Sequence, residues 1–125
     1  MSTWHALLYP IKEGSEETVK ELFRNSGRPN FTITDKEGNV VGRLLATMAF
    51  VGAGTAIRVI EVDGPLPLVA AHMSQQPEVR EFERQLEEHL TEGRDMVSPA
   101  GARAFFQKAG MENVLNRRAP EAEAA

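Results

Sequence analysis

Two β-prone runs between Gly42 and Gly64 dominate the hydrophobic pattern of the chain, and a short Gly-Ala-Gly turn joins them. Strict alternation makes the first run apolar on both faces, with Leu44, Ala46, Met48 and Phe50 on one face and Leu45, Thr47, Ala49 and Val51 on the other. The second run divides in the same way, into Ile57 with Val59 and Ile60 with Val62. An antiparallel pair with one face in water would alternate apolar and polar residues. The pattern therefore predicts a long hairpin, from about Val40 to Asp63, that is covered on both faces.

The length of the chain indicates what covers the two faces of the hairpin. The helices of a chain of 125 residues can cover one face of the hairpin, but they leave little to cover the other. A second copy of the chain is the obvious candidate for the other face. The sequence thus predicts a homodimer, in which two sheets close face to face into a barrel.

Further strands and helices are indicated on both sides of the hairpin. Strands are expected at residues 4–10 and 31–34, and a helix is expected after Ser15, which suits an N-cap. Helical segments are expected from Pro67 to Gln76, from Pro77 to Leu90 and from Ala100 to Ala109, the last with Ser98 as N-cap and Gly110 as stop. Residues 95–97 are a possible short last strand.

This order of elements defines the predicted fold class. Strand, helix, strand, strand, helix and a weak final strand are close to the split βαβ arrangement called ferredoxin-like. We therefore expect one ferredoxin-like α+β domain over residues 1–115, built as a dimeric α+β barrel with an extra C-terminal helix. Residues 116–125 are expected to form a flexible tail.

Composition narrows the classes of function. The chain has no cysteine, a formal charge of −4 and no apolar run of membrane-spanning length. Its N-terminus lacks a basic segment typical of a secretion signal, so we expect a cytoplasmic protein that binds neither membrane nor nucleic acid. Three scattered histidines and the lack of a Gly-rich phosphate loop predict neither a metal nor another cofactor.

Four segments together resemble a known family, the SchA/CurD-like proteins of bacterial aromatic polyketide pathways. They are WHALLYPIKEGSEETVKELF, IRVIEVDGPLP, AAHMSQQPEVREFE and RDMVSPAGARAFFQKAGM, and the resemblance covers residues 3–111. More distantly, the layout is similar to tetracenomycin-type cyclases and cofactor-free antibiotic-biosynthesis monooxygenases, which are dimeric α+β barrels. The resemblance implies spore-pigment or pentangular-polyphenol biosynthesis, an aromatic polyketide ligand and contact with other polyketide synthase enzymes.

The acid–base residues of those cyclases do not carry over to this chain. Their His-Asp pair after the first helix falls near Ser26 and Gly27, and their third-strand histidine falls at Arg58. The resemblance therefore implies a cyclase as the first interpretation, which acts by positioning and by stabilising an anion. A cofactor-independent monooxygenase that oxidises an anthrone or phenol is the second, and a non-catalytic accessory partner is the third.

Arginines and histidines are the candidate catalytic groups. Arg58 shares a face with Ile60 and Val62, so it can hold a phenolate or enolate in an apolar cavity; the alternative is an ion pair with Glu61 or Asp63 at the rim. His5 lies in the first strand, and His72 lies on a helix where a structural role is the alternative. His89 is expected at the surface.

A second set of residues is expected to bind the substrate. Trp4 and Tyr9 offer an aromatic surface with a polar tip, and core packing is the alternative for both. Arg43 either lines the cavity or is a solvated strand end. The apolar hairpin residues in the set are Met48, Phe50 and Ile60. Phe105 and Phe106 either anchor the last helix or close the cavity mouth.

Overall fold

The structure is a computed structural model that describes residues 2–95 and 98–120. Its elements, in chain order, are β1 (Ser2–Pro10), α1 (Glu16–Arg24), β2 (Thr32–Thr34), β3 (Val40–Gly52), β4 (Thr55–Asp63), α2 (Leu66–Gln75), α3 (Pro77–Glu87), α4 (Pro99–Ala109) and β5 (Gly110–Met111). The strands form an antiparallel sheet in the order β2-β3-β4-β1-β5. The predicted long hairpin and the helices on either side of it are confirmed.

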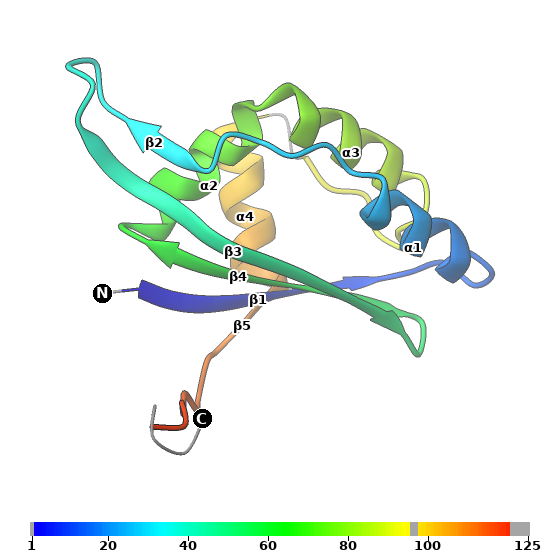
Figure 1. The fold of residues 1–125 in the computed structure, drawn as a ribbon. Coiled ribbons are helices and arrows are strands. Elements are labelled where there is room, and N and C mark those ends of the chain that lie inside the picture. Colours follow the sequence, from blue (N-terminus) through cyan, green and yellow to red (C-terminus); the bar gives the residue numbers. More distant parts are fainter. Residues whose placement is uncertain (1, 96–97, 121–125) are drawn as a thin grey trace.

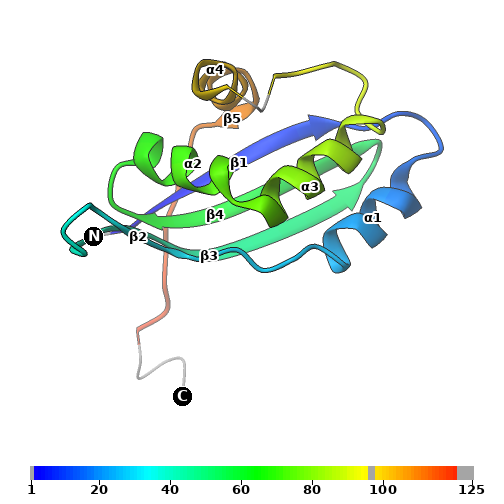
Figure 2. The same cartoon turned by 90° about the horizontal axis from the view of Figure 1, so that it is seen from above.

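The helices all lie on one face of this sheet. The opposite face carries no helix or strand of the described chain, and the segment after β5 runs below it toward the C-terminus (Figures 1 and 2). Because β4 is antiparallel to both β1 and β3, β1 and β3 run parallel, and the connection between them passes through α1 on the helix-covered face and then through β2. This is the split βαβ arrangement, so the ferredoxin-like α+β fold is confirmed. No helix in residues 2–95 and 98–120 is long and apolar enough to cross a membrane.

A two-residue turn fixes the register of the β3–β4 hairpin. Ala53 has φ 53° and Gly54 has φ 71°, so both central residues are left-handed, as a type I′ turn requires. The amide of Gly54 also donates to Glu16 Oε1 at 2.5 Å, which links the turn to the start of α1. The turn therefore aligns Gly52 with Thr55 and every pair that follows.

A β-bulge overturns one detail of the expected alternation in β3. The pairing with β4 shifts between Leu44 and Ala46, so Leu45 is an extra residue. Leu44 consequently pairs with Val62 on the helix-covered face, whereas Ala46 pairs with Glu61 on the bare face. The prediction that Leu44 shares a face with Ala46, Met48 and Phe50 is therefore wrong, because strict alternation takes no account of a bulge.

The core lies between the sheet and the helices, in two clusters. The cluster beside α1 and α3 consists of Leu7, Tyr9, Ile11, Val19, Ala56, Phe82, Leu86 and Leu90. The cluster beside α2 consists of Ile33, Leu44, Ile60, Val62 and Val69. Both clusters draw on the same sheet face, and the space between them is the site described below.

Two expectations about the C-terminal half need correction. Residues 96 and 97 of the expected last strand lie outside the described residues, and the observed last strand, β5, follows the last helix and pairs with Ala6 and Leu7. Helix α3 ends at Glu87, not Leu90, because Leu90 forms a bridge to Ile11 and is buried in the core. The boundary between a domain at 1–115 and a tail at 116–125 stays a prediction.

Ser98 caps α4 as expected. Its hydroxyl accepts the amide of Gly101 at 3.0 Å and donates to Asp95 Oδ2 at 2.5 Å. We expect Ser98→Ala to lower the free energy of unfolding by about 1 kcal/mol, because one orphan helix amide loses its acceptor. Urea denaturation checks this, and Ser98→Thr, whose hydroxyl can both accept from Gly101 and donate to Asp95, should retain most of the stability. A Ser98→Ala variant as stable as the wild type would contradict the cap assignment.

Candidate functional site: a cavity closed by a clamped arginine

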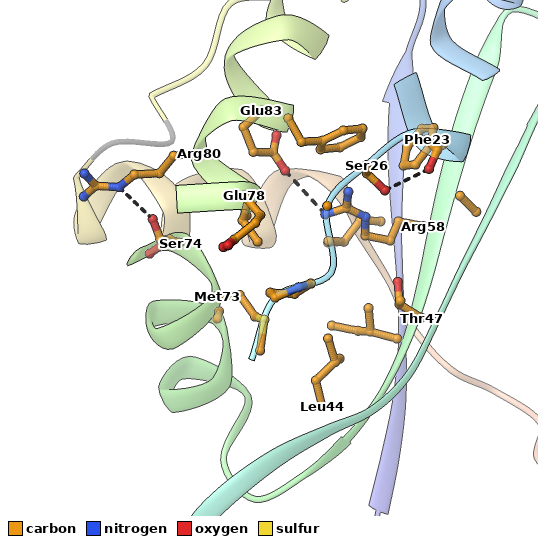
Figure 3. A pocket seen from close by; sticks show the side chains of 18 of the residues that line it. Phe23, Ser26, Leu44, Thr47, Arg58, Met73, Ser74, Glu78, Arg80 and Glu83 are labelled. Atoms are coloured by element: carbon orange, nitrogen blue, oxygen red, sulfur yellow. Dashed lines mark hydrogen bonds and ion pairs between the residues drawn. The ribbon is translucent and has the colours of Figure 1, made fainter. Parts of the chain in front are cut away.

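A cavity of about 990 Å³ lies between the helix-covered face of the sheet and helices α2 and α3. Its apolar wall takes Leu7, Tyr9 and Phe82 from one core cluster and Leu44, Ile60 and Val69 from the other. Figure 3 shows Leu44 and Thr47 on the sheet side and Met73 on the α2 side of this space. The volume is at the upper end of the range of small-molecule sites, so the cavity can hold a ligand of several rings.

Arg58 brings a positive charge into this apolar space from β4. Its side chain points away from the sheet toward α3 (Figure 3), and Nη1 donates to Glu83 Oε1 at 3.4 Å. The Cζ atom lies over the ring of Phe23 at 5.5 Å and over that of Phe82 at 5.0 Å. A carboxylate and two aromatic faces thus hold the guanidinium in one orientation.

The environment keeps Arg58 charged. Burial by itself would lower the pKa of Arg58, but Tyr9 and Glu83 outweigh burial and raise the pKa above its ordinary value. The side chain remains 22% exposed, so the charge is accessible from the cavity. The site therefore presents a permanent cation to a ligand.

A second arginine lies behind Arg58. The side chain of Arg94 is 6% exposed, donates to the other oxygen of Glu83, and donates through Nε to Glu87 Oε2 at 2.9 Å. Its Cζ lies 4.7 Å from the Phe105 ring centroid and 5.4 Å from that of Tyr9. Arg58 and Arg94 thus form one buried network with two glutamates of α3, and in this network Glu83 bridges the two cations.

Tyr9 connects this network to the cavity. The residue is 1% exposed, and its ring stacks on Phe105 at a centroid distance of 5.3 Å. Burial raises the pKa of the Tyr9 phenol, and the nearby Arg58 opposes this only in part. The phenol therefore stays protonated near neutral pH and can donate a hydrogen bond.

The segment between α1 and β2 borders the cavity opposite the sheet. Ser26, Gly27, Arg28 and Pro29 all line the space, and Ser26 Oγ donates to the carbonyl of Phe23 at 2.8 Å. A Cβ at Gly27 would lie 2.9 Å from Cγ of Glu78, so the segment approaches α3 too closely for a side chain at this position. Glycine at position 27 thus lets the segment lie against α3.

Four of the nine residues expected in the site line the cavity, and the arrangement differs from the one expected. Arg58, Tyr9, Ile60 and Met48 are among the lining residues, although strand pairing places Met48 opposite Val59, on the bare face. The alternative ion pair of Arg58 with Glu61 or Asp63 is wrong, because both carboxylates belong to the bare face and Glu61 accepts from Ser2 Oγ at 2.7 Å. The partner of Arg58 is Glu83.

Three expected substrate-binding residues lie away from this cavity, on the bare face. Trp4 pairs with Glu61, and Phe50 pairs with Ile57 and is 58% exposed. Arg43 pairs with Asp63 and is exposed at the β2 side of the sheet. The structure therefore separates them from Arg58 by the thickness of the sheet.

The histidines do not line the cavity either. His5 Nε2 lies 2.8 Å from Thr3 Oγ1, and burial lowers the pKa of His5. His72 Nε2 lies 3.0 Å from the carbonyl oxygen of Asn30 and 3.2 Å from Nε2 of Gln76, which are the contacts of a structural residue. His89 is half-buried and not at the surface, because its Nδ1 hydrogen-bonds Ser15 Oγ at 3.1 Å.

Sequence reasoning missed Glu83 and Arg94. Neither is among the candidate residues named from the sequence, and both are charged, which is typical of residues exposed to solvent. The signal for Glu83 was its spacing, since it lies four residues after Val79 and three before Leu86 and so shares their buried helix face. Arg94 carries no such signal, because it follows the helix. Within the described residues, no three His, Cys, Asp or Glu side chains group in a way that could hold a metal ion.

Fold and cavity together define a class: a ferredoxin-like α+β domain whose helix-side cavity is lined by an arginine that a buried ionic network holds in place. The chain belongs to the SchA/CurD-like domain family, whose model matches residues 2–118. No solved structure matches the chain.

Three curated relatives come from Streptomyces. The chain is 36% identical to "Polyketide synthase CurD" of Streptomyces cyaneus over 121 residues, 95% of this chain and 32% of that protein. It is 33% identical to "Protein SchA" of Streptomyces halstedii over 88% of this chain and 28% of that protein. It is 31% identical to a "42.8 kDa protein in whiE locus" of Streptomyces coelicolor, over 97% of this chain and 29% of that protein. The chain thus spans about a third of the length of these relatives.

Proposed function

We propose that this chain tailors an aromatic polyketide, and that it acts as a cyclase on a poly-β-ketone or a partly cyclised intermediate. The observation that carries the proposal is the accessible, permanently charged guanidinium of Arg58 in the wall of a large, mostly apolar cavity. One relative is named a polyketide synthase, which supports the choice of substrate class. A homodimer and contact with other polyketide enzymes belong to the same proposal.

The proposed cyclisation requires few functional groups from the protein. A methylene between two ketones loses a proton to water and becomes an enolate, whose negative oxygen binds Arg58. The enolate carbon then forms a bond to a ketone carbon further along the chain, and that carbonyl oxygen takes up a proton before water is lost. Arg58 stabilises the developing anion beside the apolar wall of the cavity, and the cavity shape selects the pair of carbons that meet.

The experiment follows dissolved oxygen and product mass while the purified protein acts on a reactive anthrone-type intermediate and, separately, on a freshly synthesised poly-β-ketone. A cyclase changes the ring pattern of the poly-β-ketone without oxygen uptake above the spontaneous rate. Oxygen uptake with an added oxygen in the product would show a cofactor-independent monooxygenase. Neither change, together with co-purification of a pathway enzyme, would show an accessory partner.

The homodimer rests on the bare sheet face. Strand pairing places apolar residues in rows across this face, and the clearest row runs from Leu8 through Ile57 to Phe50. Leu8 is 36% exposed and Phe50 58% exposed, and a neighbouring row joins Ala6, Val59 and Met48. A contiguous apolar sheet face of this kind is typical of an interface.

We expect Phe50→Glu to convert the dimer to a monomer, because a carboxylate at this end of the apolar row would be buried in the interface without a partner. Light scattering coupled to size-exclusion chromatography measures the mass. The matched control is Leu68→Glu, since Leu68 is 38% exposed on α2, on the other side of the molecule. A wild-type protein that is monomeric at all concentrations would refute the dimer.

A further inference from the structure

The guanidinium of Arg58 has donors that remain available to a ligand. Nη1 is the nitrogen bonded to Glu83, and neither Nε nor Nη2 hydrogen-bonds another residue of the described chain. In residues 2–95 and 98–120, the only fully buried side-chain nitrogen or oxygen without a hydrogen-bond partner is Nη1 of Arg94. Nε and Nη2 of Arg58 lack a partner among these residues but are not fully buried. Nε and Nη2 are therefore accessible, and the space they reach is the cavity that Arg58 lines.

The two aromatic rings decide which side of the guanidinium a ligand can approach. Phe23 and Phe82 both lie within 5.5 Å of Cζ, and the cation lies over their faces. Packing against these rings leaves the edge of the guanidinium, where N–H groups point outward in parallel, as its open side. Glu83 holds the opposite end and limits rotation.

The ionic network that holds Arg58 has no net charge. Arg58 and Arg94 carry two positive charges, and Glu83 and Glu87 carry two negative ones. A balanced network attracts anions in general only weakly, so discrimination between ligands must come from the geometry of the hydrogen bonds.

We propose that Arg58 recognises two adjacent oxygens that share one negative charge, as found in an enolised β-diketone or a carboxylate. The proposal rests on the proposed function, since a poly-β-ketone presents a β-diketone at each enolisable methylene. Parallel N–H groups match two such oxygens with two charge-assisted hydrogen bonds, whereas a phenolate with a single oxygen accepts at one point. Arg58 therefore selects the β-diketonate portion of the substrate over an isolated phenolate.

The test is equilibrium binding of three naphthalene probes substituted at the same ring position: naphthoate, the enolate of naphthoyltrifluoroacetone, and naphtholate. Fluorescence titrations are run at a pH at which all three probes are ionised. We expect the two forked anions to bind about tenfold more tightly than naphtholate, the effect of one additional charge-assisted bond. Preference for only one of the forked anions supports the proposal and identifies whether carboxylate or diketonate is the source.

Arg58→Lys is the matched variant, because it keeps the charge and removes the fork. In this variant, the ratio of the affinity for a forked anion to the affinity for naphtholate should fall to near one. The thermal transition of the variant shows whether it is folded. A ratio near one in the wild type, a ratio that persists in folded Arg58→Lys, or no binding of either forked anion would overturn the proposal. The wild-type ratio decides even if the variant does not fold.

These outcomes are separate from those of the proposed function. None of the probes can cyclise, so the titrations report recognition alone. Forked discrimination without any cyclisation would leave this inference standing and remove the cyclase. Cyclisation by a protein that binds all three probes equally would support the cyclase and overturn this inference.

Discussion

Replacing Arg94 by leucine is expected to lower the free energy of unfolding by about 3–5 kcal/mol, the usual cost of removing one member of a buried ion network. Arg94 is 6% exposed, and it supplies hydrogen bonds to both Glu83 and Glu87. Without it, Glu83 retains only the longer bond from Arg58, and the partly exposed Glu87 loses its cation. A loss of this size is a large part of the total stability of a domain.

Chemical denaturation followed by tryptophan fluorescence and circular dichroism measures this effect. The matched control is Arg24→Leu, which removes an ion pair of ordinary geometry between Arg24 and Glu21 at 2.7 Å. Both side chains of that pair are more than half exposed, so the control should change stability by less than about 1 kcal/mol. Equal effects of the two substitutions would show that the Arg94 network does not hold α3 to the sheet.

Arg58→Leu is expected to reduce turnover by about 100- to 1,000-fold, the usual effect of removing one donor that stabilises an anionic transition state. Leucine keeps an apolar contact with Phe23 and Phe82, whose rings pack against each other at a centroid distance of 4.8 Å, so the fold should persist. The expected loss is mainly in kcat, because the apolar walls that bind the rest of the substrate are unchanged. Steady-state kinetics on the cyclisation reaction give the two constants separately.

Arg43→Leu provides the comparison that locates the reaction. Arg43 lies on the bare face, and Arg58 lies in the helix-side cavity. We expect the loss of turnover in Arg58→Leu to exceed the loss of turnover in Arg43→Leu by at least about tenfold. The opposite order would place the substrate between the sheets of a dimer and would contradict the helix-side site.

Most of the fold was accessible from sequence because its signals are local. The turn after β3 needs left-handed residues, the caps need Ser98 and glycine, and the length of the apolar hairpin marks the centre of the sheet. The bulge at Leu45 was not accessible, because one extra residue leaves the composition of the strand unchanged and alters only its pairing. The last strand, β5, was missed since two residues carry no periodic pattern.

The candidate site was accessible only in part. Arg58 stands out because a charge in an apolar strand has few explanations, and the structure places it in the cavity. Its partner was not accessible, because Glu83 comes from a helix 25 residues later and only tertiary packing brings the two together. The split of the expected binding residues between two sheet faces has the same origin: alternation shows which residues share a face but not which face the helices cover.

Reconstitution with an aromatic polyketide synthase that releases an uncyclised poly-β-ketone tests the central claim most directly. Product ring patterns are compared for the wild type, for Arg58→Leu and for the synthase alone. The account predicts one dominant ring pattern with the wild type, and with Arg58→Leu the same mixture that the synthase gives by itself. A dominant pattern that survives in folded Arg58→Leu, or a wild type that leaves the mixture unchanged, would contradict it.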